Sequence, residues 1–512
     1  MPFAREALAY LRRHPDFAAM TLVAVPLSAA DPQTLLADTR RAQTAGADVV
    51  EWRLDTCLKL GADLATIIAA IPQAALPVLA TLRDHSECGD WQGSPAERDR
   101  WLTAADAAGA AYIDIELATL TAWRPATARL ILSSHDFTGI GHDLPGKIAA
   151  MRAAGGLPKI AITARDAADL ALIHDLLAAT PAGSDLIALA MGEHGLPSRL
   201  LAGVWGGFLT FARLGDQAGS APGQPTVGDL LGIYRLKTQR RDWKVLGVIG
   251  SPIAHSLSPH IHNAALAANG IPAVYVPFRV EDAPAFWAAC GGWIAGLSIT
   301  IPHKQALQPA MATLAPLAKA IGAMNTIVHS TTTVGANTDA GAIIACVEGA
   351  AGTLTGKTVL CLGAGGVGRA IAHALASRGA KIVIANRTAE RATELAAEVG
   401  GQAVAWDAAT GVAYDVLVNG TAQGMGKPDE SPWPAAAHRP GTVVFDTVYV
   451  PLETRLLREA KAAGATVVAG LDMFILQAAD QYGRFTGQAA PQDLMRATAL
   501  GRLTALPAKE DS

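Results

Sequence analysis

The chain of 512 residues opens with a regular alternation of apolar runs and stretches of helical periodicity, such as DPQTLLADTRRAQTAG. A run of four to eight apolar residues between polar or turn residues is typical of a buried strand. Such runs recur as TLVAVP (21–26), VVEWRL (49–54), VLATLR (78–83), YIDIEL (112–117), RLILSSH (129–135), KIAITA (159–164), LIALAMG (186–192) and GFLTFARL (207–214). Strands that alternate with helices in this number predict a (β/α)8 TIM barrel.

The second half of the chain has a different apolar pattern. After a last barrel loop (215–228) and an expected helix, DLLGIYRLKTQRR, a new strand KVLGVIG begins at 244. Strand–helix alternation continues to about residue 345. At 357, KTVLCLGAGGVGRAIAHAL runs from an apolar strand through glycines into a helix, as in Rossmann-type nucleotide-binding domains. Further strands are expected at 381–386, 416–420, 442–448 and 466–470.

These patterns predict an α/β protein with a TIM barrel followed by a two-lobed second half. A final helical stretch, MFILQAADQYGRFTG, is expected to pack back on the lobe that precedes the glycine loop. The expected divisions are an extension (1–20), a barrel (21–240), a first lobe (243–345 plus 472–505) and a Rossmann-type domain (346–471).

Composition and charge exclude several classes of protein. The net charge is −4 and 17% of the residues are charged, so no basic excess indicates nucleic acid or a membrane surface. None of the five cysteines lies in a C-x-x-C pair, and neither a disulfide framework nor a metal site is expected. The first twenty residues suit a short amphipathic helix better than a signal or transit peptide, which predicts a cytoplasmic location. No oligomeric state is predicted.

Polar residues interrupt the barrel strands near their C-terminal ends, where TIM-barrel enzymes carry their chemistry. Each of them alone has an ordinary structural explanation, and only their assembly at one barrel mouth indicates a site. They are Glu51, Arg53, Arg83, His135 and Met191, with Glu87 and Arg199 in the following loops and Lys159 nearer the start of its strand.

Lys159 is unusual because it lies in an otherwise apolar strand. Burial or a nearby cation favours the neutral amine of a lysine, which can condense with a ketone to an imine. The imine acidifies the neighbouring C–H, so that a base removes this proton and a β-hydroxyl leaves. His135 is the natural acid–base group, and Glu87 is suited to orient and polarise it.

Six motifs of the first half resemble type I 3-dehydroquinate dehydratase along essentially all of residues 21–235. They are EWRLD (51–55), R-x3-E (83–87), SSHDF (133–137), PKIA (158–161), AMGEHGLPSR (190–199) and SAPGQ (220–224). The resemblance implies that Lys159 forms the imine and that His135 moves protons with help from Glu87. It implies substrate contacts from Glu51, Arg53, Arg83, Met191, Arg199 (on the carboxylate) and, on a lid loop, Ser220 and Gln224. Cys88 stands where the family usually has glycine.

The glycine loop of the second half has the G-x-G-x-x-G spacing at residues 363–368. Glycines there let backbone N–H groups approach a pyrophosphate at a helix N-terminus. About twenty residues on, NRTAER (386–391) carries Arg387 and Arg391 and no acid at the strand tip. Arginine favours a ribose 2′-phosphate, so NADP is expected rather than NAD. The expected cofactor contacts from the loop are Gly363, Ala364, Gly365, Gly366 and Gly368.

Lys304, which follows the strand LSITIP, and Asp339 form a candidate proton-transfer couple for exchange between an alcohol and a ketone. These residues belong to motifs that resemble shikimate dehydrogenase over about 244–505. The motifs are SPIAHSLSPHIHN (251–263), LSITIPHK (297–304), GAMNTI (322–327), GANTDAGA (335–342), NGTAQGM (419–425), DTVYVPLETRLL (446–457) and GLDMFILQA (470–478).

The second resemblance implies further contacts. Ser256 and Ser258 would bind the substrate carboxylate with help from Tyr449. Ring hydroxyls would contact Thr300, Asn325, Asp339 and Gln477, and the cofactor would contact Asn386, Arg387, Thr388, Arg391 and Gly470. Gly420 stands where the family often has a second threonine.

Together the two resemblances imply consecutive steps, since the product of the first, 3-dehydroshikimate, is the substrate of the second. The order of the halves resembles the fused plant enzymes. Three alternatives stay open: a second half that prefers quinate, one half that is a non-catalytic regulatory module, and a fusion that serves mainly as a scaffold. By resemblance, Ser256 and Ser258 favour shikimate over quinate.

Overall fold

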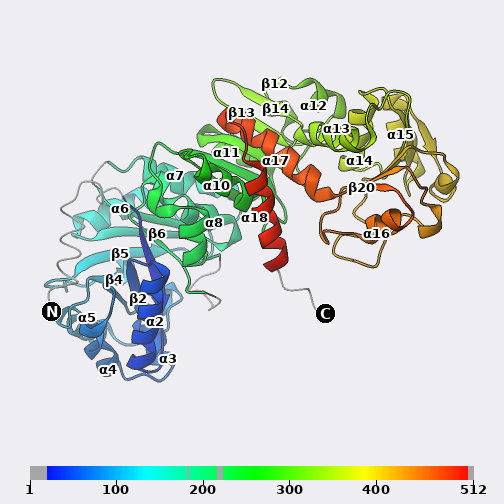
Figure 1. Ribbon diagram of the computed structural model, residues 1–512. Coiled ribbons are helices and arrows are strands. Elements are labelled where there is room, and N and C mark those ends of the chain that lie inside the picture. Colours follow the sequence, from blue (N-terminus) through cyan, green and yellow to red (C-terminus); the bar gives the residue numbers. More distant parts are fainter. Residues whose placement is uncertain (1–19, 182–183, 216–222, 506–512) are drawn as a thin grey trace. The chain divides into compact units, whose positions relative to one another are not determined.

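The computed structural model describes residues 20–181, 184–215 and 223–505, so the expected helix in the first twenty residues lies outside the described residues. The chain divides into two compact units (Figure 1). The first unit contains Met1–Val245, Ser251–Ala254 and Pro272–Trp293, and the second contains Leu246–Gly250, His255–Ile271 and Ile294–Ser512.

The first unit is built on an eight-stranded parallel sheet in the order β7-β6-β5-β4-β3-β2-β1-β8. The N–H of Phe208 donates to the carbonyl of Leu186 at 2.9 Å, which joins the two ends of the sheet beside β7 and β8. This closure confirms the predicted barrel. The strands are β1 (Leu22–Leu27), β2 (Val49–Arg53), β3 (Val78–Thr81), β4 (Tyr112–Glu116), β5 (Arg129–His135), β6 (Leu157–Thr163), β7 (Ile187–Met191) and β8 (Leu209–Phe211).

Helices follow the barrel strands, as the apolar periodicity predicted. The side chain of Asp31 accepts from the N–H groups of Gln33 and Thr34, and Gly46 ends the same helix in the left-handed conformation. The helices of the barrel are α2 (Pro32–Ala45), α3 (Leu54–Lys59), α4 (Leu64–Ala69), α5 (Pro95–Ala107), α6 (Leu144–Ala153), α7 (Leu170–Ala178), α8 (Gly192–Leu200) and α9 (Ala202–Trp205). The strand β10 (Ala273–Arg279) and the helix α11 (Ala283–Cys290) also group with this unit.

The continuous helix predicted over DLLGIYRLKTQRR is wrong. A single π-helical turn covers Asp229–Ile233 and a separate 3-10 turn covers Leu236–Thr238. Arg235 between them has a φ of 53°, in the left-handed region that interrupts a right-handed helix.

The second unit contains a mixed sheet in which neighbouring strands run β9-β11-β13-β14-β12. The pairings β11–β13 and β13–β14 are antiparallel. The strands are β9 (Lys244–Gly250), β11 (Ile294–Ile299), β12 (Thr313–Leu314), β13 (Thr326–His329) and β14 (Thr333–Ala336). The helices that accompany them are α10 (Ser258–Ala268), α12 (Pro316–Ile321) and α13 (Thr338–Ala351).

The other sheet of this unit is parallel, in the order β17-β16-β15-β18-β19-β20, as in a Rossmann-type domain. Alternate residues of β15 enter two apolar cores, with Val359 and Cys361 on one face and Leu360 and Leu362 on the other. The strands are β15 (Thr358–Leu362), β16 (Lys381–Ala385), β17 (Gln402–Val404), β18 (Val416–Asn419), β19 (Val443–Asp446) and β20 (Thr466–Val468). The helices are α14 (Gly366–Ala376), α15 (Ala389–Val399) and α16 (Arg455–Ala462).

Two final helices, α17 (Gly470–Thr486) and α18 (Gln492–Ala505), return to the mixed sheet, as predicted. Gln481 of α17 donates to the carbonyl of Asn325 and accepts from the hydroxyl of Ser298. Figure 1 shows α17 beside α13.

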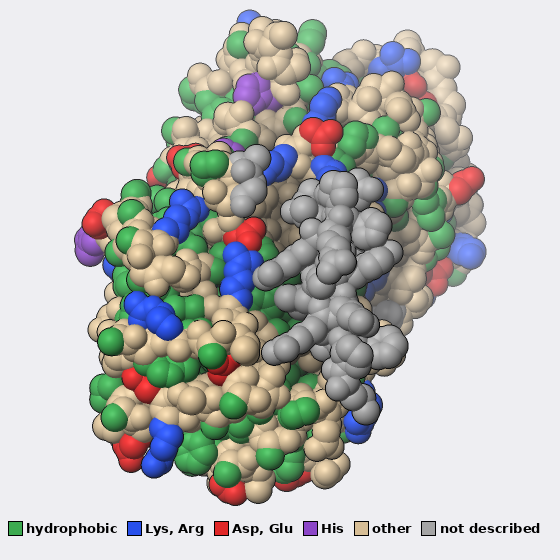
Figure 2. Space-filling view, turned by 90° about the vertical axis from the view of Figure 1, so that its left-hand side faces the viewer, with side chains coloured by type: hydrophobic (Ala, Val, Ile, Leu, Met, Phe, Trp, Pro, Cys, Tyr) green, Lys and Arg blue, Asp and Glu red, His purple; other side chains and the backbone are tan. Residues whose placement is uncertain are grey.

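The distribution of charge on the surface indicates which kinds of partner the protein could bind. Basic and acidic side chains are interspersed on the face shown in Figure 2, in keeping with the small net charge. Over the described ranges, the helices are all too short or too polar to span a bilayer.

Candidate active sites

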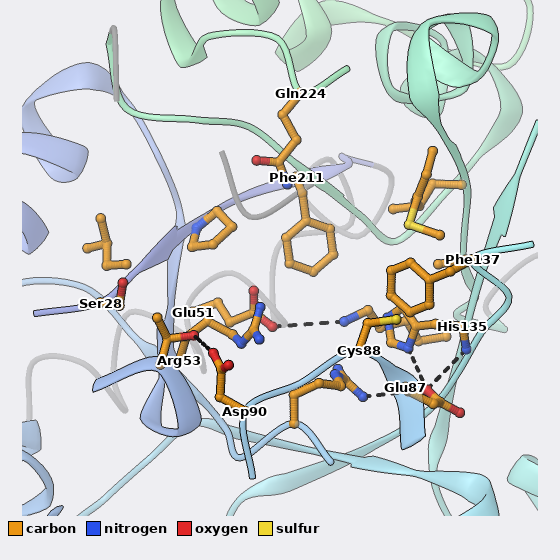
Figure 3. A pocket seen from close by; sticks show the side chains of 18 of the residues that line it. Ser28, Glu51, Arg53, Glu87, Cys88, Asp90, His135, Phe137, Phe211 and Gln224 are labelled. Atoms are coloured by element: carbon orange, nitrogen blue, oxygen red, sulfur yellow. Dashed lines mark hydrogen bonds and ion pairs between the residues drawn. The ribbon is translucent and has the colours of Figure 1, made fainter. Parts of the chain in front are cut away.

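A pocket of about 400 Å³ lies at the C-terminal end of the barrel. Arg53, His135 and Met191 are the last residues of β2, β5 and β7, which places their side chains at the same end. The predicted site residues that line the pocket are Glu51, Arg53, Arg83, Glu87, His135, Lys159, Met191, Arg199 and Gln224 (Figure 3). Ser220 lies outside the described residues.

Lys159 is buried although it is only the third residue of β6. Its ammonium lies 2.7 Å from Oδ2 of Asp114 and 3.9 Å from Oε1 of Glu51. The ring of Phe211 lies 4.7 Å from the same nitrogen, a distance at which an aromatic face attracts a cation. The length of the side chain explains how a residue near the start of its strand reaches the pocket.

Arg83 joins two carboxylates that the sequence analysis did not single out. Its guanidinium donates to Asp114 at 2.9 Å and to Glu116 at 2.7 Å, and also to the hydroxyl of Ser133 at 2.8 Å. Burial alone would lower the pKa of Arg83, but the two acids raise it, so Arg83 is a permanent cation. The available signal was the strand YIDIEL, which places two acids at alternate positions of an otherwise apolar run.

His135 and Glu87 form an acid–base pair. The distance from Nδ1 of His135 to Oε2 of Glu87 is 2.7 Å, and the backbone N–H of His135 donates to the same oxygen. Burial, reinforced by Arg83 and Lys159, holds the pKa of His135 well below its usual value. Burial raises the pKa of Glu87 to about 7, against the opposing effect of Arg83. A neutral imidazole that donates from Nδ1 keeps a lone pair on Nε2 and can accept a proton from a substrate.

Phe137 lies against this pair and was not predicted as a site residue. Its ring stacks on His135 with 5.9 Å between centroids and 17° between planes, and Figure 3 shows the two rings side by side. The motif SSHDF contained this signal, because an aromatic residue two positions after a strand-end histidine can share its surroundings.

Arg199 is a buried cation, and two of its three side-chain nitrogens have no hydrogen-bond partner in the described part of the chain. The side chain is 2% exposed, and Nε and NH1 have no hydrogen-bond partner among the described residues. Burial lowers the pKa of Arg199 to about 10. An unpaired guanidinium in a pocket fits a ligand carboxylate, which would satisfy the free N–H groups.

Cys88 shows why its position in the family usually carries glycine. Its φ is 56°, in the left-handed region that favours glycine, directly after the turn His85–Glu87. The turn is therefore kept, with a strained residue, and Glu87 still faces His135.

The second predicted site lies in the second unit, around Lys304 and Asp339. The ammonium of Lys304 lies 2.7 Å from Oδ2 of Asp339, which is in the first turn of α13. The backbone carbonyl of Lys304 accepts from the N–H of Met324, which holds the loop after β11 against the start of β13. The predicted couple is therefore assembled across 35 residues of sequence.

Asn325 and Gln477 meet through Thr338, a residue that sequence reasoning missed. Asn325 donates to the hydroxyl of Thr338 at 2.9 Å and accepts from its N–H at 2.8 Å. The same hydroxyl lies 3.5 Å from Oε1 of Gln477. The sequence signal for Thr338 was its hydroxyl group, which stands next to Asp339 in the motif GANTDAGA.

The remaining predicted substrate contacts lie in separate local arrangements. The N–H of Ser258 donates to the hydroxyl of Ser256 at the start of α10. The N–H of Thr300 donates to the carbonyl of Ile249, at the ends of β11 and β9. Tyr449 stacks on Phe474 with centroids 5.0 Å apart, and burial raises its pKa.

The glycine loop fits a dinucleotide phosphate. Gly363 has a φ of 103°, and a Cβ on Gly368 would lie 2.2 Å from the carbonyl oxygen of Gly363, so both positions require glycine. A Cβ on Gly365 or Gly366 would meet nothing within 4 Å, which leaves open space at the N-terminus of α14. The N–H of Ala364 donates to Asn386.

The other predicted cofactor residues lie in the loop after β16, in the first turn of α15 and at the start of α17. Asn386 donates to the carbonyl of Thr388, and Arg387 and Arg391 are exposed to solvent. Gly470 begins α17, where a Cβ would lie 2.6 Å from the carbonyl oxygens of Thr447 and Val448.

Close packing also explains why position 420 is a glycine. A Cβ on this residue would lie 2.9 Å from the side chain of Ile371 and 3.1 Å from Cα of Gly368. The threonine that the family often has here would press on the glycine loop. Over the described ranges, no cluster of three or more histidine, cysteine or acidic side chains is arranged to hold a metal.

Family models match most of the chain in four segments. Type I 3-dehydroquinase matches residues 23–241, and the shikimate dehydrogenase substrate-binding domain matches 248–327. Shikimate / quinate 5-dehydrogenase matches 345–423, and the shikimate 5′-dehydrogenase C-terminal domain matches 470–500. The first match covers the barrel pocket, and the others include Lys304, Asn325 and Gln477 of the second site, whereas Asp339 lies between two matched segments.

Individual proteins are similar to one half of the chain or to most of it. A shikimate dehydrogenase (NADP(+)) of Halobacterium salinarum is 44% identical over 265 residues, covering 51% of this chain and 99% of that protein. The solved structure of shikimate 5-dehydrogenase from Thermus thermophilus with NADP(H) and shikimate is 36% identical, with a TM-score of 0.46, and covers 51% of this chain and 99% of that one. The chloroplastic bifunctional 3-dehydroquinate dehydratase/shikimate dehydrogenase of Arabidopsis thaliana is 39% identical over 508 residues, covering 93% of this chain and 83% of that protein. The chain therefore belongs to the family of bifunctional 3-dehydroquinate dehydratase/shikimate dehydrogenases.

Proposed function

We propose that this protein dehydrates 3-dehydroquinate to 3-dehydroshikimate in its barrel and reduces the product to shikimate in its second half with NADPH. The observation that carries this proposal is that a lysine–aspartate pair is assembled in each of the two predicted sites. Lys159 with Asp114 is buried in the barrel that also holds the acid–base pair, and Lys304 with Asp339 belongs to the unit that also contains a glycine loop fitting a dinucleotide phosphate. Three of the four expected divisions have a proposed role. Residues 21–240 carry the first reaction, and residues 243–345 with 472–505 bind the substrate of the second. Residues 346–471 bind the cofactor.

The proposed dehydration begins when Arg199 binds the substrate carboxylate and Lys159 attacks the ketone. The amine and the ketone form an imine and release water. His135, held by Glu87, then takes the proton next to the imine carbon and returns a proton to the leaving β-hydroxyl. Hydrolysis of the imine frees Lys159 and 3-dehydroshikimate. Glu51, Arg53, Met191 and Gln224 contact the bound substrate around these groups.

The proposed reduction needs one proton and one hydride. NADPH supplies the hydride when it is bound. Lys304, oriented by Asp339, donates the proton to the oxygen of the former ketone. Asn325 and Gln477, connected through Thr338, offer amide groups to the ring hydroxyls. Ser256, Ser258, Thr300 and Tyr449 complete the proposed substrate contacts.

The residues of the nucleotide loop support NADP as the cofactor. Gly365 and Gly366 leave room for the pyrophosphate at the start of α14, and Asn386 anchors the loop through the N–H of Ala364. Arg387 in the loop after β16 and Arg391 in the first turn of α15 are exposed, where a 2′-phosphate would lie. Thr388 and Gly470 are further proposed contacts.

A coupled assay tests both activities at once. Purified protein is mixed with 3-dehydroquinate and NADPH, and the loss of nicotinamide absorbance is followed. We expect consumption with the wild type and a rate at least about 100-fold lower with either Lys159→Ala or Lys304→Ala. If the wild type consumes no NADPH, the two-step proposal is wrong, and addition of 3-dehydroshikimate identifies the silent half.

Substrate preference and regulation need separate measurements. Oxidation of shikimate and of quinate by the same preparation with NADP+ compares the two substrates, and Ser256 and Ser258 favour shikimate. A non-catalytic half would leave one of the two half-reactions at the background rate. If separately expressed halves give the same steady-state rates as the full chain, the scaffold alternative stays open. The cytoplasmic location predicted from the sequence stays a prediction.

A further inference from the structure

Asp114 and Glu116, the two acids on β4, make different contacts with the other charged side chains inside the barrel. Asp114 and Glu116 are each 1% exposed, and both accept from Arg83. Asp114 reaches the nitrogen of Lys159 at 2.7 Å. Glu116 instead accepts from the N–H of Asp84 and lies 3.8 Å from Arg98. The two acids therefore share burial, strand and an arginine, and differ in their contact with the reactive lysine.

The carboxylate of Asp114 is held in one orientation. Its Oδ1 accepts from Arg83 at 2.9 Å and from the hydroxyl of Ser133 at 2.6 Å. This leaves Oδ2 for Lys159. Burial would raise the pKa of Asp114, but Arg83 and Lys159 lower it, so the group is a carboxylate. A fixed anion thus lies beside the nitrogen at which the proposed imine forms.

The chemistry at this nitrogen keeps one positive charge throughout. The ammonium and the ketone become an iminium and water: the C–N bond forms, the C–O bond breaks, and two of the three ammonium protons leave with the oxygen. The charge stays on the nitrogen, in a buried pocket where an unpaired ion is costly. The iminium is the electron-withdrawing form, so dehydration depends on keeping the proton.

We propose that Asp114 is the counter-ion that keeps the imine on Lys159 protonated during dehydration. The inference rests on the proposed dehydratase activity and adds to it a residue that neither the motifs nor the pocket lining indicated. Ser133 and Arg83 act as its positioning residues, because they bind Oδ1 and direct Oδ2 at the nitrogen.

Other groups near Lys159 are less suited to this role. Glu51 is 3.9 Å away, and its Oε1 accepts from the hydroxyl of Thr81. The charged, titratable and aromatic groups that face Lys159 or line the same pocket include Glu51 and Arg53 from β2, Arg83 and Glu87 after β3, Asp114 from β4, His135 from β5 with Phe137 after it, Arg199 from α8 and the ring of Phe211 from β8. Of the two acids that pair with Lys159, Asp114 lies closer to the nitrogen.

The test compares Asp114→Asn with the matched variant Glu116→Gln. Each protein is incubated with 3-dehydroquinate and sodium borohydride from pH 5 to pH 10, and the reduced adduct on Lys159 is quantified by mass spectrometry. For Asp114→Asn, we expect the trapping profile to move to lower pH by about one unit or more, since a nearby anion favours the charged nitrogen by that amount. We expect kcat for dehydration to fall about 100-fold, with a smaller change in KM. For Glu116→Gln, we expect the profile to stay close to that of the wild type.

The inference is overturned if Asp114→Asn has the wild-type profile, or if Glu116→Gln moves the profile as far. If Asp114→Asn does not fold, Asp114→Glu keeps the anion and is expected to keep the wild-type profile, and a shifted profile then contradicts the inference. Failure of the proposed function looks different, because the wild type then gives no adduct, or Lys159→Ala gives the same amount.

Discussion

Two lysine–aspartate pairs of equal length lie in different surroundings in this molecule. The ammonium–carboxylate distance is 2.7 Å for Lys159 with Asp114 and 2.7 Å for Lys304 with Asp339. The side chain of Lys159 is 4% exposed, whereas that of Lys304 is 21% exposed. The first pair lies between barrel strands, and the second joins a loop to the start of a helix.

The difference shows that surroundings, more than the pair itself, select the chemistry of a lysine. In the barrel, a buried nitrogen with a fixed anion can carry a covalent iminium away from water. In the second unit, a partly exposed ammonium can give a proton to a substrate oxygen and recover one from solvent. The following experiments test this comparison, from the largest expected effect to the smallest.

Lys159→Ala is expected to have the largest effect, because it removes the buried amine to which the covalent intermediate is assigned. We expect dehydration to fall about 10⁴-fold or more, while reduction of 3-dehydroshikimate is unchanged. The two half-reactions are measured separately on the same preparation. Residual dehydration within tenfold of the wild type would mean that the barrel works without an imine.

Lys304→Ala is expected to show the complementary loss. Reduction of 3-dehydroshikimate should fall about 10²- to 10⁴-fold, as is typical when a general acid is removed, and dehydration should be unchanged. Asp339→Asn should give a loss in the same direction. Borohydride trapping of 3-dehydroshikimate on Lys304 in the wild type would contradict the contrast between the two lysines.

Glu87→Gln tests the acid–base pair of the barrel. The pKa of Glu87 is raised to about 7. The Nδ1–H of His135 donates its strongest hydrogen bond to Glu87 when the Glu87 carboxyl is ionised. We therefore expect kcat/KM of the wild type to fall as the pH decreases through about 7, and the variant to lose this limb along with about 100-fold in rate.

Glu87 affects activity and stability in opposite directions as the pH rises. The activity increases, whereas the contribution of Glu87 to the stability of the fold decreases. A carboxyl whose pKa is raised on folding stabilises the fold while it is protonated. This contribution is fully present below pH 4.5, near the ordinary value, and is lost as the pH rises through about 7. The thermal midpoint of Glu87→Gln, relative to the wild type, should therefore increase over this range. A constant difference between the two proteins would show that burial does not raise the pKa.

Arg199→Met separates binding from stability in the barrel. The variant loses the free N–H groups of Arg199, so KM for 3-dehydroquinate should rise about 10- to 100-fold, the usual value of a charge-assisted contact. The unpaired buried cation is removed as well, so the thermal midpoint of the barrel should rise by about 2–4 °C. A rise in KM with a lower midpoint would show that Arg199 has a structural partner instead.

Cys88→Gly is expected to have the smallest effect. Glycine adopts the φ of 56° without strain, which should stabilise the barrel by about 1 kcal/mol. The midpoint of thermal unfolding is the measurement, and Cys88→Ala is the control, because alanine keeps the strained conformation. Equal midpoints for the two variants would show that the turn stores no strain.

Most of the fold could be predicted from the sequence because the signals that indicate it are local. Runs of apolar residues located the barrel strands and the parallel sheet, and the glycine spacing located the nucleotide loop. The errors are also local in origin. The helix expected after the barrel is interrupted at Arg235, where the chain takes a left-handed conformation that no periodicity indicates. The three-residue strand β17 is too short to stand out.

The sequence indicated which residues belong to the candidate sites. Which of these residues contact one another could be seen only in the folded structure. Motif resemblance indicated His135 with Glu87 and Lys304 with Asp339, and the structure places each pair within 2.7 Å. Asp114 was missed because an acid in a strand has no sequence feature that names its partner. Its contact with Lys159 spans 45 residues and depends on β4, β5 and β6 being neighbours.

The sequence by itself determined the order of the elements, the glycine positions and the family, because backbone conformation and apolar periodicity are properties of short segments. Only the tertiary structure decided which charges pair, which lysine or arginine is buried, and which acid lies beside the reactive nitrogen. These properties depend on burial and on distances between strands that are far apart in sequence, since the strength of an electrostatic interaction is set by the surroundings in which two groups meet.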